Sequence, residues 1–162
     1  YTLCEWRIVG AVIMSVTTRA ARGEDEARCK ALLEVLGAAD NQRPAPPGFH
    51  AVFEKLLTEE RGRVIVAEEA GVVLGMATVS YNVALRYDGE YCQLEELIVD
   101  PAARGKNLGG LLVQRTIADA SERGCAEFGL YLVVHTEHNR SFYEKYGLRA
   151  VGTEMRLPLN SD

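Results

Sequence analysis

The stretch L-E-E-L-I-V-D-P-A-A-R-G-K-N-L-G-G-L-L, from Leu94 to Leu112, decides the fold of this chain. Its apolar residues 97–99 predict a strand that ends at Asp100-Pro101. The leucines that follow lie at i, i+3 and i+4 from Leu108, which predicts the first turns of a helix. A strand, a loop with glycines and a helix N-terminus form an anion site, because backbone N–H groups are unpaired there and the helix dipole favours negative charge.

The loop and the first helical turn have the residue types that a phosphate site needs. Glycines let a phosphate approach the main chain closely, and Arg104 and Lys106 add positive charges. The stretch has neither the P-loop pattern G-x-x-x-x-G-K-S/T nor the dinucleotide pattern G-x-G-x-x-G, so it is not typical of those nucleotide-binding classes. The residues expected to contact the anion are Arg104, Gly105, Lys106, Asn107, Leu108, Gly109 and Gly110.

This loop resembles the pyrophosphate loop of GNAT-type N-acetyltransferases, whose pattern is Q/R-x-x-G-x-G/A after a strand. Arg104 and Gly109 match the pattern, and Asn107 stands where it has its first glycine. Asparagine adopts the left-handed backbone conformation more readily than other non-glycine residues, so this departure is mild. The glucosamine-phosphate acetyltransferases of the family look similar here, with an amide residue at this position.

A second stretch, N-R-S-F-Y-E-K-Y-G-L at residues 139–148, resembles the C-terminal motif of the same family, N-x-x-F-Y-x-K-x-G-F/L. Two motifs in the right order, about thirty residues apart, are far more specific than either alone. By element order the resemblance covers residues 16–159. It implies that acetyl-CoA binds as co-substrate, and that the backbone of Leu97, Ile98 and Val99 pairs with its pantetheine arm.

The resemblance also implies roles for residues of the second motif. Asn139 holds the pantetheine arm or caps a helix, since asparagine suits both roles. Phe142 and Tyr143 contact the cofactor. A phenol close to the leaving sulfur can give it a proton, and the family uses the tyrosine of F-Y-x-K in this way. The alternative for Tyr143 is an amphipathic tyrosine of the core.

Glu95 and Glu96 are the candidates for deprotonating an ammonium substrate before it attacks the thioester. Strand alternation sends neighbouring side chains to opposite faces unless a bulge intervenes. The resemblance to relatives with I-E-D or L-E-D at this point favours Glu95 as the base, with Glu96 as a substrate anchor; both could instead be charges on the sheet surface. The family transfers directly within a ternary complex, and an acyl-cysteine route through Cys92 or Cys125 is disfavoured, because cysteine is more often a small core residue.

Periodicity and turn signals predict one α/β domain over residues 14–162, preceded by a possible extension at 1–13 that an edge strand or a partner chain would order. The expected order is β-α-α-β-β-β-α-β-α-β, which is that of a GNAT-like, mixed and mostly antiparallel sheet flanked by helices. The predicted strands are 16–20, 63–68, 72–81, 91–99, 128–134 and 151–157; the predicted helices are 24–36, one around 52–57, 108–123 and 139–146. We expect 128–134 to be a buried central strand and 151–157 to close the sheet.

The composition of the chain limits the classes of partner that it is expected to bind. The net charge of −5 argues against nucleic acid or an anionic membrane and favours a cationic amine. Four scattered cysteines without a C-x-x-C pattern predict no metal site and a reduced, cytoplasmic protein. Family precedent favours a homodimer. The acceptor is left open between an aminoglycoside (an antibiotic-resistance activity), an amino sugar phosphate, a polyamine, an amino acid and a protein N-terminus. A non-catalytic acyl-CoA-binding regulatory module is the rival function.

Overall fold

The computed structural model describes residues 15–39 and 44–159, and the predicted extension at 1–13 lies outside them. Five strands form one sheet in the order β1-β2-β3-β4-β5. The first four are antiparallel neighbours, and β4 and β5 are parallel. The strands are β1 (Thr17–Ala20), β2 (Gly62–Glu69), β3 (Val72–Ala84), β4 (Gly89–Val99) and β5 (Phe128–Leu130). The helices are α1 (Glu26–Ala39), α2 (Phe49–Leu57), α3 (Leu108–Arg123) and α4 (Arg140–Glu144).

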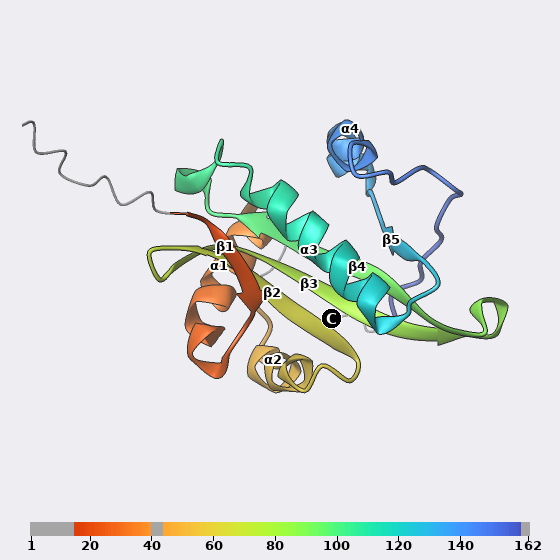
Figure 1. Cartoon of the computed structure of the whole chain (residues 1–162), viewed down its shortest axis with the longest axis horizontal. Helices are drawn as coiled ribbons and strands as arrows, with labels where there is room; N and C mark the ends of the chain where they lie inside the picture. The colour runs from red at the N-terminus through yellow and green to blue at the C-terminus, as the bar shows by residue number, and fades with distance from the viewer. Residues whose placement is uncertain (1–14, 40–43, 160–162) are drawn as a thin grey trace, which may run out of the picture.

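Helices cover both faces of the sheet (Figure 1). On one face Leu112 of α3 is fully buried with Ile65 of β2, because the leucine repeat of α3 turns toward the sheet. On the other face Leu32 of α1 and Phe53 of α2 pack with Met76 of β3. The predicted mixed, mostly antiparallel sheet flanked by helices is confirmed. None of the described helices is long and apolar enough to cross a lipid bilayer.

The ends of α3 lie where the sequence predicts them. Asn107 is the N-cap residue and adopts the left-handed conformation, with φ 58° and ψ 23°. Gly124 is the C-cap residue, also left-handed, with φ 85°. A tight turn also joins β2 to β3, with positive φ at both Ala70 and Gly71. Local turn chemistry therefore fixes these connections.

The end of the chain differs from the prediction. The strand expected at 128–134 is only the three-residue β5, which lies at the sheet edge, and Tyr131 and Val133 beyond it are about half exposed. The closing strand expected at 151–157 is not formed within the described residues. The two errors share one cause. Residues 128–134 could be a central strand of the sheet only if residues 151–157 formed a further strand beside them. After α4 the chain instead runs on past β5 without adding a strand (Figure 1).

Short 3-10 helices make the remaining turns of the chain. They are η1 (Gly23–Asp25), η2 (Leu85–Tyr87), η3 (Pro101–Ala103) and η4 (Val134–Asn139). Two of them border the site: η3 connects β4 to the glycine loop, and η4 leads into α4. The predicted helix 139–146 is correspondingly shorter, since only 140–144 is α-helical, and Gly147 follows its end with φ 89°.

Candidate active site

A cavity of about 200 Å³ lies at the carboxyl end of β4, over the N-terminus of α3. All but one of its lining residues were predicted to contact the cofactor; the exception is Ala103. The lining residues are Val99, Ala103, Arg104, Gly105, Asn107, Leu108, Gly109, Gly110 and Phe142. The two sequence motifs, from separate parts of the chain, therefore meet at one cavity that has the N–H groups of a helix N-terminus in its wall.

The glycines of this wall allow α4 to approach α3. A Cβ atom on Gly109 would lie 3.5 Å from the ring of Phe142. A Cβ atom on Gly110 would lie only 2.1 Å from the Tyr146 hydroxyl and 2.4 Å from the Asn107 side-chain oxygen. The aromatic rings of Phe142 and Tyr146 pack edge to face, with their centroids 5.4 Å apart. Gly109 and Gly110 thus allow α3 and α4 to pack closely, and they also leave the main chain of the cavity wall accessible to a ligand.

The two cations of the loop lie in different surroundings. Lys106 forms an ion pair of 2.5 Å with Glu69 of the β2–β3 hairpin and does not line the cavity. Arg104 lines the cavity, is exposed, and forms no ion pair with any described residue. Of the two predicted charges, Arg104 is therefore the one available to a phosphate.

The start of the loop is fixed by a residue that the sequence analysis did not identify. Arg28 of α1 forms an ion pair with Asp100 and donates a 2.9 Å hydrogen bond to the Val73 carbonyl. Asp100 in turn accepts a 2.8 Å hydrogen bond from the Ala102 backbone N–H. The Arg28 guanidinium and this backbone N–H hold the pKa of the Asp100 carboxyl below its usual range. A helix on one face of the sheet thus anchors the start of the glycine loop.

β4 separates from β5 beside the candidate catalytic residues. The parallel pairing joins only 92–94 of β4 to 128–130 of β5. From Glu95 to Val99 the edge of β4 that faces away from β3 has no strand partner among the described residues. The backbone of Leu97, Ile98 and Val99 lies on this open edge, where an extended ligand with amide groups can pair as an added strand.

A β-bulge places both glutamates on the same face of the sheet. Thr78 pairs with Glu96 and Val79 with Leu94, which leaves Glu95 as the extra residue. Thr78 and Ser80 point to one face because they are two residues apart on β3. The Thr78 hydroxyl donates a hydrogen bond to Glu96 and the Ser80 hydroxyl donates one of 2.5 Å to Glu95. Strand alternation alone does not predict this pairing.

The two carboxylates differ in exposure, and this sets their chemistry. Glu95 is exposed, whereas Glu96 is partly buried. Burial and, second, the negative charge of Glu95 raise the pKa of the Glu96 carboxyl to about 7. A carboxylate with a pKa near neutrality is suited to accept a proton from an ammonium group. Thr78 and Ser80 were missed in the sequence analysis; the alternation of the polar residues Thr78, Ser80 and Asn82 along β3 is the signal that could have indicated them.

Tyr143 packs against the core face that α3 covers, next to residues of β4 and β5. Its ring contacts Phe142 edge to face, with a centroid distance of 5.0 Å. Burial raises the pKa of the Tyr143 phenol, so that it keeps its proton at neutral pH. Tyr143 is therefore partly a core residue, as one of the two sequence alternatives has it, and its phenol is protonated at neutral pH; its role as proton donor stays a prediction.

Two further predictions concern Asn139 and the cysteines. Asn139 stands at the N-cap position of α4, but its side chain makes no capping hydrogen bond, which leaves its amide available to a ligand. Burial raises the pKa of both the Cys29 and Cys92 thiols to about 12, and burial also raises the pKa of Cys125. Such thiols are poor nucleophiles at neutral pH, so the structure gives no support to an acyl-cysteine route.

The model of the acetyltransferase (GNAT) family matches residues 28–148, from α1 through both sequence motifs. The chain belongs to the GNAT acetyltransferase family. Its predicted family and its predicted class, an acyltransferase enzyme, are thereby confirmed. The match spans the glycine loop, the bulged strand β4 and the tyrosine of α4.

Several named proteins are similar to this chain. Glucosamine 6-phosphate N-acetyltransferase 1 of Oryza sativa subsp. japonica is 31% identical over 130 residues, which are 75% of this chain and 77% of that protein. Mycothiol acetyltransferase of Rhodococcus jostii (strain RHA1) is 33% identical over 112 residues, 68% of this chain and 34% of that protein. The crystal structure of a transcriptional regulator from Bacillus halodurans C-125 superposes with a TM-score of 0.78 at 27% identity and covers 90% of this chain and 100% of that chain.

Proposed function

We propose that this protein transfers an acetyl group from acetyl-CoA directly to a primary amine within a ternary complex. The observation that supports this most is the arrangement along β4. One strand leads from the bulged Glu95–Glu96 pair, past an open edge at 97–99, to the phosphate cavity at the N-terminus of α3. A ligand with a thioester at one end, amides in the middle and a pyrophosphate at the other matches these three parts in order.

The residues of the cavity and the open edge fit coenzyme A. Arg104 and the backbone N–H groups up to Gly110 would contact the pyrophosphate, the backbone of 97–99 would pair with the pantetheine amides, and the Asn139 amide would bind the same arm. Bound acetyl-CoA would supply the acetyl thioester. A backbone N–H of β4 would donate a hydrogen bond to the thioester oxygen as negative charge develops on it.

In this proposal Glu96 is the general base, in place of the Glu95 that the sequence favoured. Unprotonated above its pKa of about 7, Glu96 accepts the proton of the substrate ammonium, and the freed nitrogen lone pair attacks the thioester carbon. Glu95, held by the hydrogen bond from the Ser80 hydroxyl, binds the ammonium group of the substrate. The partly buried phenol of Tyr143 donates its proton to the departing sulfur and is reprotonated from solvent.

We infer that an amino sugar phosphate is the first acceptor to test. The rice relative acts on glucosamine 6-phosphate by its name, and it shares 31% identity over most of both chains. The Glu95–Glu96 pair suits the ammonium group of such a sugar. The name of the mycothiol acetyltransferase relative indicates a different acceptor. Other primary amines should therefore be tested as well.

A thiol-release assay tests the proposal. We expect acetyl-CoA turnover with glucosamine 6-phosphate or with another primary amine from a panel of aminoglycosides, polyamines, amino acids and short peptides. The alternative function is a non-catalytic regulatory module, and it is supported by the name of the Bacillus halodurans neighbour, a transcriptional regulator. This alternative predicts tight acetyl-CoA binding without turnover with any of these amines. Loss of activity in both Glu96→Gln and Tyr143→Phe is required for the roles assigned above.

We also propose that the protein acts as a cytoplasmic homodimer. Four apolar side chains of the segment after α4 are at least 80% exposed, and the outer edge of β5 has no further strand among the described residues. These residues are Val151, Met155, Leu157 and Leu159. Burial against a second copy would remove this apolar surface from water. Light scattering after size exclusion would give the mass of the particle and decide between monomer and dimer.

A further inference from the structure

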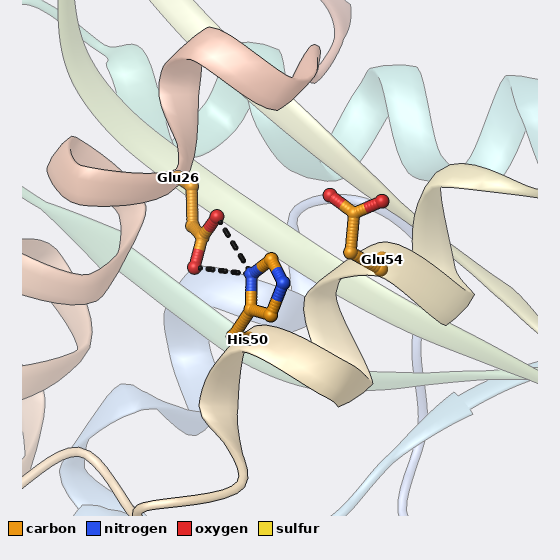
Figure 2. A group of neighbouring side chains, drawn as sticks. All are labelled: Glu26, His50 and Glu54. Atoms are coloured by element: carbon orange, nitrogen blue, oxygen red, sulfur yellow. Dashed lines mark hydrogen bonds and ion pairs between the residues drawn. The ribbon is translucent and has the colours of Figure 1, made fainter.

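A second group of ligating side chains lies away from the acetyl-transfer site, where α1 and α2 meet (Figure 2). Glu26 comes from the first turn of α1, and His50 and Glu54 come from successive turns of α2. The imidazole Nδ1 atom of His50 lies 3.0 Å from each carboxylate oxygen of Glu26. One ligating atom from each of the three residues lies within 4.8 Å of the other two.

An ordinary surface ion pair accounts for only part of this arrangement. A His–Glu pair needs one carboxylate, yet Glu54 brings a second beside the same ring and forms no ion pair with any described residue. Two carboxylates and one imidazole leave net negative charge even when the imidazole is protonated. A divalent cation at their centre would remove that charge and would use each side chain in the role it has in metalloproteins.

We propose that Glu26, His50 and Glu54 bind a divalent first-row transition metal ion, Zn²⁺ in the first place. The mixed set of one imidazole nitrogen and two carboxylates suits zinc, whereas Mg²⁺ and Ca²⁺ favour oxygen ligands throughout. With bonds of about 2.0–2.1 Å, tetrahedral coordination brings ligand atoms to roughly 3.3 Å from one another. Exposed side chains can close the remaining gap by rotating, and a water would complete the coordination.

The expected absence of a metal site rested on the scattered cysteines, which have no C-x-x-C pattern and no histidine near them at ligand spacing, and these three ligands are not cysteines. Glu26 and His50 are 24 residues apart, and only the i, i+4 spacing of His50 and Glu54 is visible in the sequence. A bound ion would link α2 to α1. Because Arg28 of α1 also fixes Asp100 at the start of the phosphate loop, the ion would connect α2 to the helix that anchors that loop.

Calorimetry with tag-free, full-length protein tests the site. We expect one Zn²⁺ ion to bind per chain, to raise the Tm, and to bind at least about tenfold more weakly to His50→Ala and to Glu54→Gln. His138→Ala and Glu34→Gln are matched controls, since they remove an exposed histidine and an exposed α1 glutamate outside the cluster and leave zinc affinity unchanged. His50 is exposed, so its replacement does not threaten the fold, which circular dichroism will verify.

Cobalt gives a second readout that does not depend on heat. Co²⁺ bound in place of Zn²⁺ should show visible absorption bands typical of nitrogen and oxygen ligation, and these bands should disappear in His50→Ala. Equal zinc affinity in wild type and His50→Ala would place the ion elsewhere and overturn the proposal. So would the absence of binding at millimolar Zn²⁺, or binding of Mg²⁺ as tight as that of Zn²⁺.

Discussion

The Ser80 hydroxyl donates a 2.5 Å hydrogen bond to Glu95, the residue that the β-bulge adds to β4. Without the bulge, Glu95 would point to the face opposite Glu96. With it, a fixed and exposed carboxylate stands beside a partly buried one whose pKa is raised to about 7. One extra residue in one strand thus creates a pair of unlike carboxylates at the point where β4 leaves β5.

Replacement of the partly buried carboxylate of Glu96 should remove the general base. We expect Glu96→Gln to lower kcat by about 100-fold and to leave the Kd for acetyl-CoA unchanged, because Glu96 lies outside the phosphate cavity. In the wild type, kcat/KM for the amine should fall as the pH drops below about 7, since Glu96 is then protonated. Steady-state kinetics over pH 5–9 would check this, and wild-type turnover in the variant would exclude Glu96 as the base.

Removal of the neighbouring charge should shift that pH profile. Glu95 is the second cause of the raised Glu96 pKa, after burial. We therefore expect Glu95→Gln to lower the pKa of Glu96 and to move the acid limb of the kcat/KM profile to lower pH. The KM for the amine should rise as well, because the anchor charge is lost. An acid limb that stays in place would show that the two carboxylates are not coupled.

The same raised pKa has a consequence for stability. The Glu96 pKa is about 7 in the folded protein against an ordinary value of 4.5, so its contribution to stability is fully present below about pH 4.5 and is lost as the pH rises through 7. Glu96→Gln carries no charge to bury. Relative to wild type it should gain up to about 3 kcal/mol of unfolding free energy at pH 8 and much less at pH 4.5. Urea unfolding at both pH values measures the difference; equal effects at the two would contradict the assignment.

Sequence reasoning succeeded where the structure depends on local backbone chemistry. The left-handed conformation of Asn107 follows from the residue type and its place before a helix, and the residues of the motif pattern line a cavity at the N-terminus of α3. It failed where distant segments decide the structure. The bulge at Glu95 arises from the pairing of β4 with β3, and the short β5 reflects a closing strand that does not form. The anchor Arg28 lies 72 residues from Asp100, and no local pattern connects the two.

Tyr143 and Tyr146 offer a matched pair for testing the proton donor. Both rings contact Phe142 edge to face, but only Tyr143 is in the proposed position to protonate the leaving sulfur. We expect Tyr143→Phe to lower kcat at least about tenfold without changing acetyl-CoA affinity, whereas Tyr146→Phe should keep kcat near the wild-type value. The comparison is made by thiol release at saturating substrates. Equal losses in both variants would indicate a packing role for Tyr143.

Replacement of Gly110 by alanine has two opposing effects on stability, a gain in helix propensity and a loss in packing. Gly110 lies in the first turn of α3, where alanine is intrinsically favoured over glycine by up to about 1 kcal/mol. The added Cβ, however, would lie 2.1 Å from the Tyr146 hydroxyl and 2.4 Å from the Asn107 side-chain oxygen. Overpacking of this kind costs about 1–3 kcal/mol, so we expect Gly110→Ala to lose stability and to weaken acetyl-CoA binding several-fold, because Tyr146 and Asn107 must both move.

The controls for Gly110→Ala separate the clash from a general effect of alanine. Gly152→Ala adds a Cβ with no neighbour within 4 Å and should change neither stability nor binding. Adding Tyr146→Phe to Gly110→Ala removes the hydroxyl at the shorter of the two contacts, so the double variant should regain part of the lost affinity. Thermal unfolding and calorimetry with acetyl-CoA measure both effects. If Gly110→Ala instead raised the Tm, helix propensity would outweigh packing, and the close approach of Tyr146 to α3 would not constrain the cavity wall.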